Sequence, residues 1–296
     1  MSRIQNILDK AEREGAALRT SRLGAPPPIA ATVPVTIDVP TPPPAVRETA
    51  IVPGPAATDS FASLSTAHAP TNELVVRLNP LLVAGLSPKS PAAEQYRQLR
   101  TRLAHTEGAQ NLRSVLVTSP QKGEGKSVTA ANLALTMAQE LHRKVIIVEA
   151  DLRKPSLQHL FGLPAGPGLT DYLAGAADLD SVMRFLPEYQ LTVIVAGTSP
   201  ANPAELLGST AMRRMLDQLR TRFDRVILDT PPVLPLADVA VLAPMVDGAL
   251  LVVRAGVTPK PAIENALRAF DSSRLLGVVL NESGMEEDYR YEAPRH

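Results

Sequence analysis

The stretch Thr118–Ser127 limits the possible folds of this chain more than any other part of it. It reads T-S-P-Q-K-G-E-G-K-S, with an apolar run at Ser114–Val117 before it and an alanine-rich helical pattern at Val128–Leu141 after it. A strand, a glycine-containing loop and a helix start in this order form a phosphate-binding loop, because backbone N–H groups and the positive end of the helix converge on an anion. The stretch therefore predicts a P-loop that binds a nucleotide.

The residues of this loop have separate expected tasks. Gly123 and Gly125 let the backbone approach an anion without interference from a Cβ atom. Lys126 reaches the β- and γ-phosphates, and the Ser127 hydroxyl is placed to bind Mg²⁺. One departure from a general P-loop is Pro120, which stands where glycine is usual. The expected nucleotide-binding set is Gly123, Glu124, Gly125, Lys126, Ser127 and Val128.

The composition removes several classes of protein. With 296 residues, 45% of them hydrophobic, the chain can bury at least one full core. Its 30 basic and 30 acidic residues cancel, so we expect no nucleic-acid partner. The absence of cysteine rules out disulfides and thiolate metal sites and suits a reducing cytoplasm. No signal peptide opens the chain and no apolar run approaches the roughly 18 residues of a membrane span, so we expect a soluble, cytoplasmic protein.

Changes in composition divide the chain into four segments. Residues 1–22 have apolar side chains at helical spacing and predict an amphipathic helix, either a frayed terminal helix or a docking helix for a partner or an anionic membrane surface. Residues 23–72 are rich in proline and predict a disordered linker. Residues 73–284 form the P-loop domain, and residues 285–296 form a flexible C-terminal tail.

The pattern of the P-loop domain predicts an α/β fold with a doubly wound, mostly parallel sheet flanked by helices, since strands alternate with helices along it. The expected strands are Glu73–Leu78, Ser114–Val117, Lys144–Val148, Leu191–Val195, Arg225–Leu228, Gly248–Val253 and Gly277–Leu280. The expected helices are Ala92–His105, Val128–Leu141, Thr210–Arg222, Leu236–Ala243 and Lys260–Phe270, with short helical or loop segments at Pro155–Phe161, Leu169–Leu173 and Asp180–Phe185.

Acidic residues follow two of these strands at the edge where open α/β sheets bind ligands. Glu149 and Asp151 follow the strand Lys144–Val148. Asp229 follows the strand Arg225–Leu228, which is the form of a Walker B motif whose carboxylate holds Mg²⁺ directly or through water.

A charged stripe lies on the expected helix Ala92–His105. Glu94, Arg97 and Arg100 are three residues apart and therefore share one face. Taken alone, the stripe is typical of a solvated face with internal Glu–Arg pairs, each of which stabilises the helix by only about 0.2–0.5 kcal/mol.

Several longer motifs occur in a fixed order. They read S-P-A-A-E-Q-Y-R-Q-L-R-T at 90–101, G-E-G-K-S at 123–127, E-A-D-L-R-K-P at 149–155, N-P-A-E-L-L-G-S at 202–209, F-D-R-V-I-L-D-T-P-P-V-L at 223–234 and V-D-G-A-L-L-V-V-R-A-G at 246–256. With this set, residues 73–284 resemble the bacterial tyrosine kinase family. The match is to the cytoplasmic CpsD/CapB group of capsule and exopolysaccharide assembly, within the MinD/ParA-like P-loop ATPases.

The resemblance implies an ATP- and Mg²⁺-dependent protein-tyrosine autokinase. Its catalytic residues would be Lys126, Glu149, Asp151 and Asp229, and its metal ligands Ser127, Asp151 and Asp229. The γ-phosphoryl group would pass to Tyr289 and Tyr291 in the tail of a neighbouring subunit, with Glu149 or Asp151 accepting the tyrosine proton.

The resemblance also implies partners. Glu94, Arg97 and Arg100 match the E-x-x-R-x-x-R motif through which family members assemble into rings. The group regulates polysaccharide chain length or export, which implies polysaccharide biosynthesis and export proteins as partners. A membrane adaptor of the polysaccharide copolymerase type would recruit the chain to the inner face of the plasma membrane.

Departures from the family pattern leave two alternatives open. The family usually has Asp at the position of Glu149, and the tail has only Tyr289 and Tyr291 where the family has many tyrosines. These departures favour a catalytically weak, ATP-binding assembly factor of an export complex. The second alternative is a partitioning-type ATPase, but those proteins usually have a second lysine where this chain has Gln121.

Overall fold

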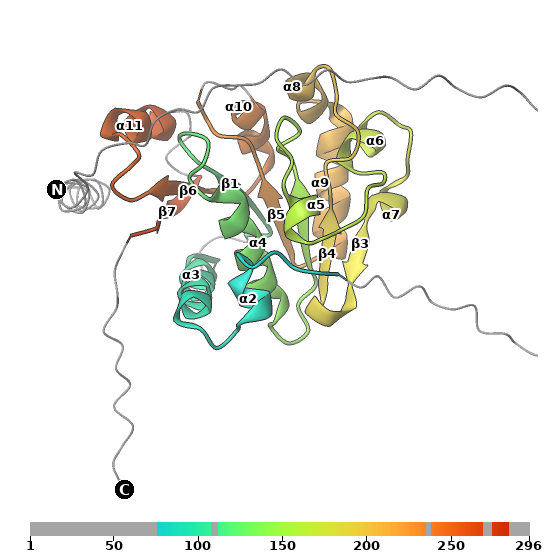
Figure 1. Cartoon of the computed structure of the whole chain (residues 1–296). Helices are drawn as coiled ribbons and strands as arrows, with labels where there is room; N and C mark the ends of the chain where they lie inside the picture. The colour runs from blue at the N-terminus through green and yellow to red at the C-terminus, as the bar shows by residue number, and fades with distance from the viewer. Residues whose placement is uncertain (1–75, 108–111, 235–237, 269–273, 284–296) are drawn as a thin grey trace, which may run out of the picture. The chain divides into compact units, whose positions relative to one another are not determined.

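The computed structural model describes residues 76–107, 112–234, 238–268 and 274–283 (Figure 1). The predicted amphipathic helix 1–22, the linker 23–72 and the tail 285–296 lie outside these ranges and stay predictions. No helix within the described ranges combines the length and the apolar character that crossing a membrane requires.

A sheet of seven strands forms the centre of the described part of the chain, in the order β3-β4-β2-β5-β1-β6-β7. All neighbouring strands are parallel except β3, which runs antiparallel to β4. The predicted doubly wound, mostly parallel sheet is therefore confirmed. The strands are β1 (Ser114–Thr118), β2 (Val145–Glu149), β3 (Arg184–Leu186), β4 (Leu191–Ile194), β5 (Arg225–Asp229), β6 (Gly248–Arg254) and β7 (Leu275–Asn281).

Helices cover both faces of the sheet, so its central strands are buried and read as near-continuous apolar runs. Successive side chains of a strand point to opposite faces. Val115 and Val117 of β1 accordingly pack in the core beneath α4, whereas Leu116 packs in the core beneath α9. The α-helices are α2 (Val83–Leu86), α3 (Pro91–Glu107), α4 (Lys126–Ala138), α5 (Leu157–Leu160), α6 (Leu169–Leu173), α7 (Leu179–Val182), α8 (Pro203–Leu207), α9 (Thr210–Arg222), α10 (Asp238–Leu242) and α11 (Lys260–Arg268). Two 3₁₀ turns, η1 (Pro187–Tyr189) and η2 (Ala243–Met245), complete the described elements.

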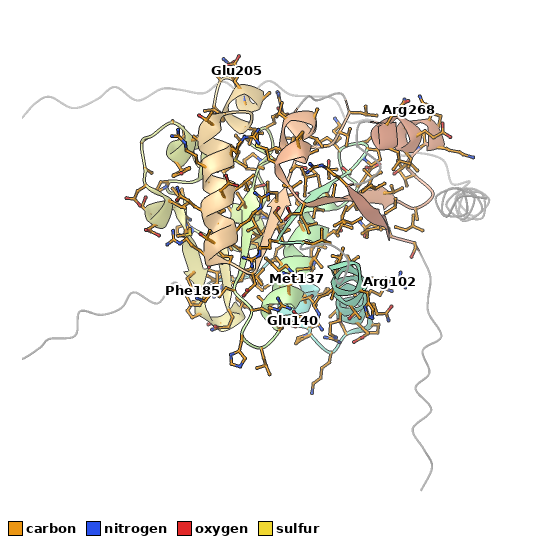
Figure 2. All side chains as sticks on the ribbon, turned by 180° about the vertical axis from the view of Figure 1, so that it is seen from behind. Arg102, Met137, Glu140, Phe185, Glu205 and Arg268 are labelled. Carbon is orange, nitrogen blue, oxygen red and sulfur yellow. The ribbon has the colours of Figure 1, made fainter. Side chains whose placement is uncertain are left out.

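Two predicted elements were wrong in their described parts. The expected strand Glu73–Leu78 is not a strand at Val76–Leu78; Leu78 is instead buried against the core beneath α4. The segment Asp180–Phe185 was expected to be helix or loop. In the structure α7 ends at Val182, and the chain then enters the edge strand β3. A strand of three residues is too short to show an alternating pattern, and Phe185 on it is 55% exposed (Figure 2).

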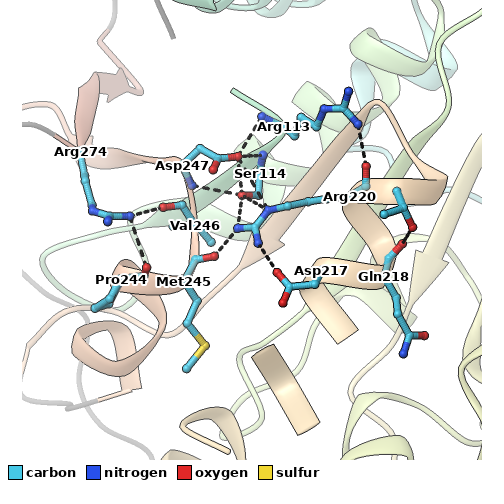
Figure 3. A network of polar contacts seen from close by, with 11 residues as sticks. Arg113, Ser114, Asp217, Gln218, Arg220, Pro244, Met245, Val246, Asp247 and Arg274 are labelled. Carbon is cyan, nitrogen blue, oxygen red and sulfur yellow. Dashed lines mark hydrogen bonds and ion pairs between the residues drawn. The ribbon is translucent and has the colours of Figure 1, made fainter. Parts of the chain in front are cut away.

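A polar network joins the amino-terminal ends of β1 and β6 to the last turns of α9 (Figure 3). One oxygen of Asp247 accepts hydrogen bonds from the backbone N–H groups of Arg113 and Ser114, at 2.9 and 2.7 Å, and from the Ser114 hydroxyl at 2.8 Å. Arg220 of α9 donates to the same hydroxyl at 2.8 Å and to the carbonyl oxygen of Met245. The network therefore fixes how α9 and β6 meet the central strand.

We expect Asp247→Ala to lower the free energy of unfolding by about 1–3 kcal/mol, because two N–H groups at the start of β1 lose their acceptor. Denaturant titration followed by circular dichroism measures the effect. Asp217→Ala is the matched control: Asp217 also pairs with Arg220, at 3.1 Å, but its side chain is 66% exposed. Its removal should change stability by less than about 1 kcal/mol. Equal midpoints for the two variants would contradict this role of Asp247.

Candidate active site

The phosphate loop connects β1 to α4 and turns on two glycines. Gly123 and Gly125 have φ angles of 83° and 86°, a left-handed conformation that side chains with a Cβ rarely adopt. A Cβ on Gly125 would also lie 2.1 Å from the side-chain nitrogen of Asn281. The first N–H groups of α4 have no acceptor within the helix and lie at its positive end. This geometry matches the P-loop that the sequence predicts.

Lys126 lies at the centre of the site, between two strand ends. Its Nζ is 2.8 Å from a carboxylate oxygen of Asp151, 3.6 Å from one of Asp229, and 3.0 Å from the Ser127 hydroxyl. These residues meet because β2, β5 and β1 are consecutive in the sheet and end at the same edge. Burial lowers the pKa of Lys126, but the charges of Asp229 and Asp151 outweigh it and hold the pKa above its usual value. Lys126 is therefore a cation.

The carboxylates beside Lys126 suit Mg²⁺. Asp229 is fully buried, and neither of its carboxylate oxygens has a hydrogen-bond partner among the described residues. Oxygen ligands from carboxylates and a hydroxyl are those that Mg²⁺ prefers, and the ion usually completes its shell with phosphates and water. By this chemistry, Ser127, Asp151 and Asp229 fit Mg²⁺ that arrives with a nucleotide. The described residues hold no group of three or more His, Cys, Asp or Glu side chains placed to bind a metal.

A pocket of about 690 Å³ opens beside these residues. That volume is typical of a small-molecule site. Arg153 on its wall is paired at 2.7 Å with Asp238, a fully buried residue 85 positions further along the chain. The sequence motif E-A-D-L-R-K-P contains Arg153 and Lys154, but the motif alone did not predict that either of them lines the site. The pocket is lined by Gln121, Lys122, Gly123, Lys126, Ser127, Asp151, Arg153, Lys154, Ser156, Pro231, Pro232 and Leu234.

The side chain of Glu124 faces away from this pocket. Its carboxylate accepts a hydrogen bond from the backbone N–H of Gln121 at 2.9 Å and one from the Thr258 hydroxyl at 2.5 Å. Its carbonyl oxygen accepts a hydrogen bond from Asn281 at 3.0 Å. Glu124 is 4% exposed, and burial raises the pKa of its carboxyl group. Its side chain thus holds the loop in shape, and only its main chain is placed to meet a nucleotide.

Glu149 also lies off the pocket wall. The residue is fully buried at the end of β2, opposite Asp229 in the register of the sheet. One carboxylate oxygen accepts from the backbone N–H groups of Ser156 and Leu157, and the other has no hydrogen-bond partner in the part of the chain that the structure describes. Burial, and then the charge of Asp229, raise the pKa of Glu149 well above its usual value. The structure brings Lys126, Ser127, Asp151 and Asp229 together. Glu149 is buried next to this group, beside Asp229 on the neighbouring strand.

The charged stripe on α3 is divided between two environments. Arg97 pairs with Glu94 at 2.6 Å, and Glu94 is 52% exposed. Arg100 instead contacts α4, where it donates to the carbonyl oxygen of Thr136 at 2.9 Å, and it pairs at 3.0 Å with Glu140 just after that helix. Arg100 thus joins two helices of one chain. The role of the stripe in a ring stays a prediction, and Tyr289 and Tyr291 lie outside the described residues.

Comparison with curated proteins decides the family. The chain is 37% identical over 217 residues to the tyrosine-protein kinase YwqD of Bacillus subtilis (strain 168), a match that covers 73% of this chain and 91% of YwqD. The chain belongs to the bacterial tyrosine kinases. It is also 33% identical over 192 residues to the tyrosine-protein kinase CpsD of Streptococcus agalactiae, covering 64% of this chain and 82% of CpsD.

A solved structure agrees with this membership. The kinase domain of the Escherichia coli tyrosine kinase ETK superposes with a TM-score of 0.63 at 32% identity, covering 68% of this bacterial tyrosine kinase and 79% of that chain. No protein-family model matches the chain. The predicted kinase activity is thereby confirmed, and the partitioning-type ATPase is the weaker alternative.

Proposed function

We propose that this bacterial tyrosine kinase uses Mg-ATP to phosphorylate Tyr289 and Tyr291 in the tail of a neighbouring copy. The observation that supports this most is that Lys126, on the wall of the pocket, contacts Asp151 and lies close to the buried Asp229. In the proposal, the cation meets phosphate oxygens, and the carboxylates meet a metal and a hydroxyl. Phosphoryl transfer depends mainly on such positioning and neutralisation of charge.

Each of these residues has a specific task in the proposal. Lys126 keeps a positive charge beside the γ-phosphate, where negative charge develops during transfer. Mg²⁺, held by the Ser127 hydroxyl and the carboxylate of Asp229, would neutralise the charge of the phosphate oxygens. Asp151 lines the pocket and is the carboxylate placed to orient the tyrosine hydroxyl and accept its proton.

The cellular role in this proposal is control of capsule or exopolysaccharide chain length or export. It is supported by the ordered motifs that the chain shares with the CpsD/CapB group and by the likeness to CpsD itself. The proposed partners are further copies of the chain, a membrane adaptor of the polysaccharide copolymerase type that brings the kinase to the inner face of the plasma membrane, and polysaccharide export proteins.

Labelled ATP separates this proposal from the assembly-factor alternative. The purified full chain is incubated with Mg²⁺ and γ-labelled ATP, and nucleotide binding is measured in parallel by equilibrium dialysis. A kinase transfers label to tyrosine in the protein. A catalytically weak assembly factor binds ATP with similar affinity but leaves the protein without label, and that result would replace the proposed function by the alternative.

We expect Glu94→Ala with Arg97→Ala to shift the assembled kinase toward monomers, because this partly exposed ion pair could exchange its partners for groups of another copy. Arg100 is left intact in this variant because it already joins α3 to α4. Light scattering with nucleotide bound gives the mass. Asp180→Ala with Arg222→Ala removes another exposed ion pair and should leave the mass unchanged. If both double variants keep the wild-type mass, the stripe is a solvated face.

A further inference from the structure

Glu149 makes its hydrogen bonds to the backbone and away from the pocket. Its Oε2 accepts from the N–H of Ser156 at 3.0 Å and from the N–H of Leu157 at 2.5 Å. These two N–H groups open α5, a helix of a single turn whose first N–H groups have no acceptor within the helix. The carboxylate supplies that acceptor from the end of β2, and the residue is fully buried.

The segment between these contacts forms one wall of the active site. Residues 150–156 connect the end of β2 to the start of α5. The two hydrogen bonds of Glu149 join the two ends of this loop. Asp151, Arg153, Lys154 and Ser156 of this loop line the pocket, whereas Glu149 does not. Asp151 is further fixed by accepting the N–H of Lys154 at 3.0 Å. The position of Asp151 relative to Lys126 thus depends on the contacts that Glu149 makes.

The length of the side chain explains why this contact occurs here. An aspartate at this position would be one methylene shorter than Glu. Its carboxylate would end about 1.5 Å short of the point that Glu149 reaches, the length of one C–C bond. It could not accept both N–H groups unless the backbone of the loop moved. The length of Glu149 therefore lets its carboxylate hold the start of α5.

We propose that Glu149 is a positioning residue that holds the loop 150–156, and that Asp151 is the carboxylate that meets the acceptor tyrosine. The inference rests on the proposed autokinase function, but its structural half concerns the loop alone. It assigns Glu149 to the loop and not to the reacting atoms.

A series of substitutions at Glu149 separates holding the loop from accepting a proton. Glu149→Gln keeps an oxygen that accepts both N–H groups but is a far weaker base, so we expect autophosphorylation within about threefold of wild type and an unchanged acidic limb of its pH profile. Glu149→Ala removes the acceptor, and since displacements near 1 Å can cost about 100-fold, we expect a loss of about 10–100-fold. If Glu149→Gln loses as much activity as Glu149→Ala, Glu149 is the base and the proposal is wrong.

Hydrogen exchange tests the structural half without any need for activity. The amides of Ser156 and Leu157 should exchange at the wild-type rate in Glu149→Gln and at least about tenfold faster in Glu149→Ala and Glu149→Asp. Asp151→Asn is the matched control, since it should lose activity while these two amides stay protected. Unchanged exchange in Glu149→Asp and Glu149→Ala would overturn the proposal. Wild-type protein that shows no autophosphorylation but the expected exchange would overturn the proposed function alone.

Discussion

Lys126→Met should lower autophosphorylation by at least about 100-fold, the largest effect that we expect from a single substitution. The variant loses the cation that contacts Asp151 and lies near Asp229, so nothing in that place offsets the charge of the phosphates. It should also be less stable by about 3–5 kcal/mol, because the two buried carboxylates lose their counter-charge. Label transfer and ATP affinity are measured below the unfolding midpoint of the variant, so that both describe folded protein.

A second substitution at the same position separates the catalytic effect from the effect on stability. Lys126→Arg keeps the counter-charge for Asp151 and Asp229 and should recover most of the stability. Its planar, wider head group does not reproduce the point charge of lysine, so activity should stay low. Lys89→Met, which removes an exposed lysine before α3, is the control for loss of one charge. If Lys126→Met incorporates label at the wild-type rate, the active site has been assigned to the wrong residues.

Tyr289→Phe with Tyr291→Phe should remove nearly all phosphotyrosine while ATP binding stays unchanged. The three other tyrosines, Tyr96, Tyr172 and Tyr189, belong to α3, α6 and η1 and are each partly buried. Burial raises the pKa of Tyr96, so a smaller fraction of its hydroxyl is ionised. The tail tyrosines lie in the charged sequence E-E-D-Y-R-Y-E, and each phosphate would add about −1.5 to −2 charge beside existing carboxylates. We expect that added charge to loosen the assembly.

Mixing two variants, neither of which can label itself, shows whether the phosphoryl group is transferred between copies. Lys126→Met has an intact tail and a disabled site, whereas Tyr289→Phe with Tyr291→Phe has an intact site and no acceptors. Transfer between neighbouring copies predicts that label appears on the Lys126→Met chain only in the mixture. Phosphotyrosine analysis of the two chains, distinguished by a mass tag, measures it. A mixture without label, beside a labelled wild type, would mean that each copy phosphorylates its own tail.

Local signals in the sequence predicted the parts of the fold that depend on local chemistry. Helix α9 has the predicted bounds Thr210–Arg222, and in the structure the Ser209 hydroxyl accepts the N–H of Met212 at its start. The phosphate loop was also predicted from a local signal, its two glycines. In the structure Gly123 and Gly125 have left-handed backbone conformations, which residues with a Cβ rarely adopt. Short elements such as β3 have too few residues to show a period.

Contacts between distant segments could not be predicted from the sequence. Arg100 pairs with Glu140, which lies 40 positions away just after α4, and Arg153 pairs with Asp238, which lies 85 positions away. The direction of the Glu149 side chain depends on one methylene and on where the loop 150–156 returns. The sequence singled out Lys126, Ser127, Asp151 and Asp229, which the structure brings together, whereas the direction in which each side chain points required the fold.

Mass spectrometry of the tail tests the central claim most directly. Purified full-length protein is incubated with Mg-ATP, and phosphate is mapped residue by residue, with Lys126→Met treated in parallel. The account predicts phosphate on Tyr289 and Tyr291 of the wild type and on neither tyrosine of the variant. Wild-type protein that binds ATP but shows no phosphate at either tyrosine would contradict it.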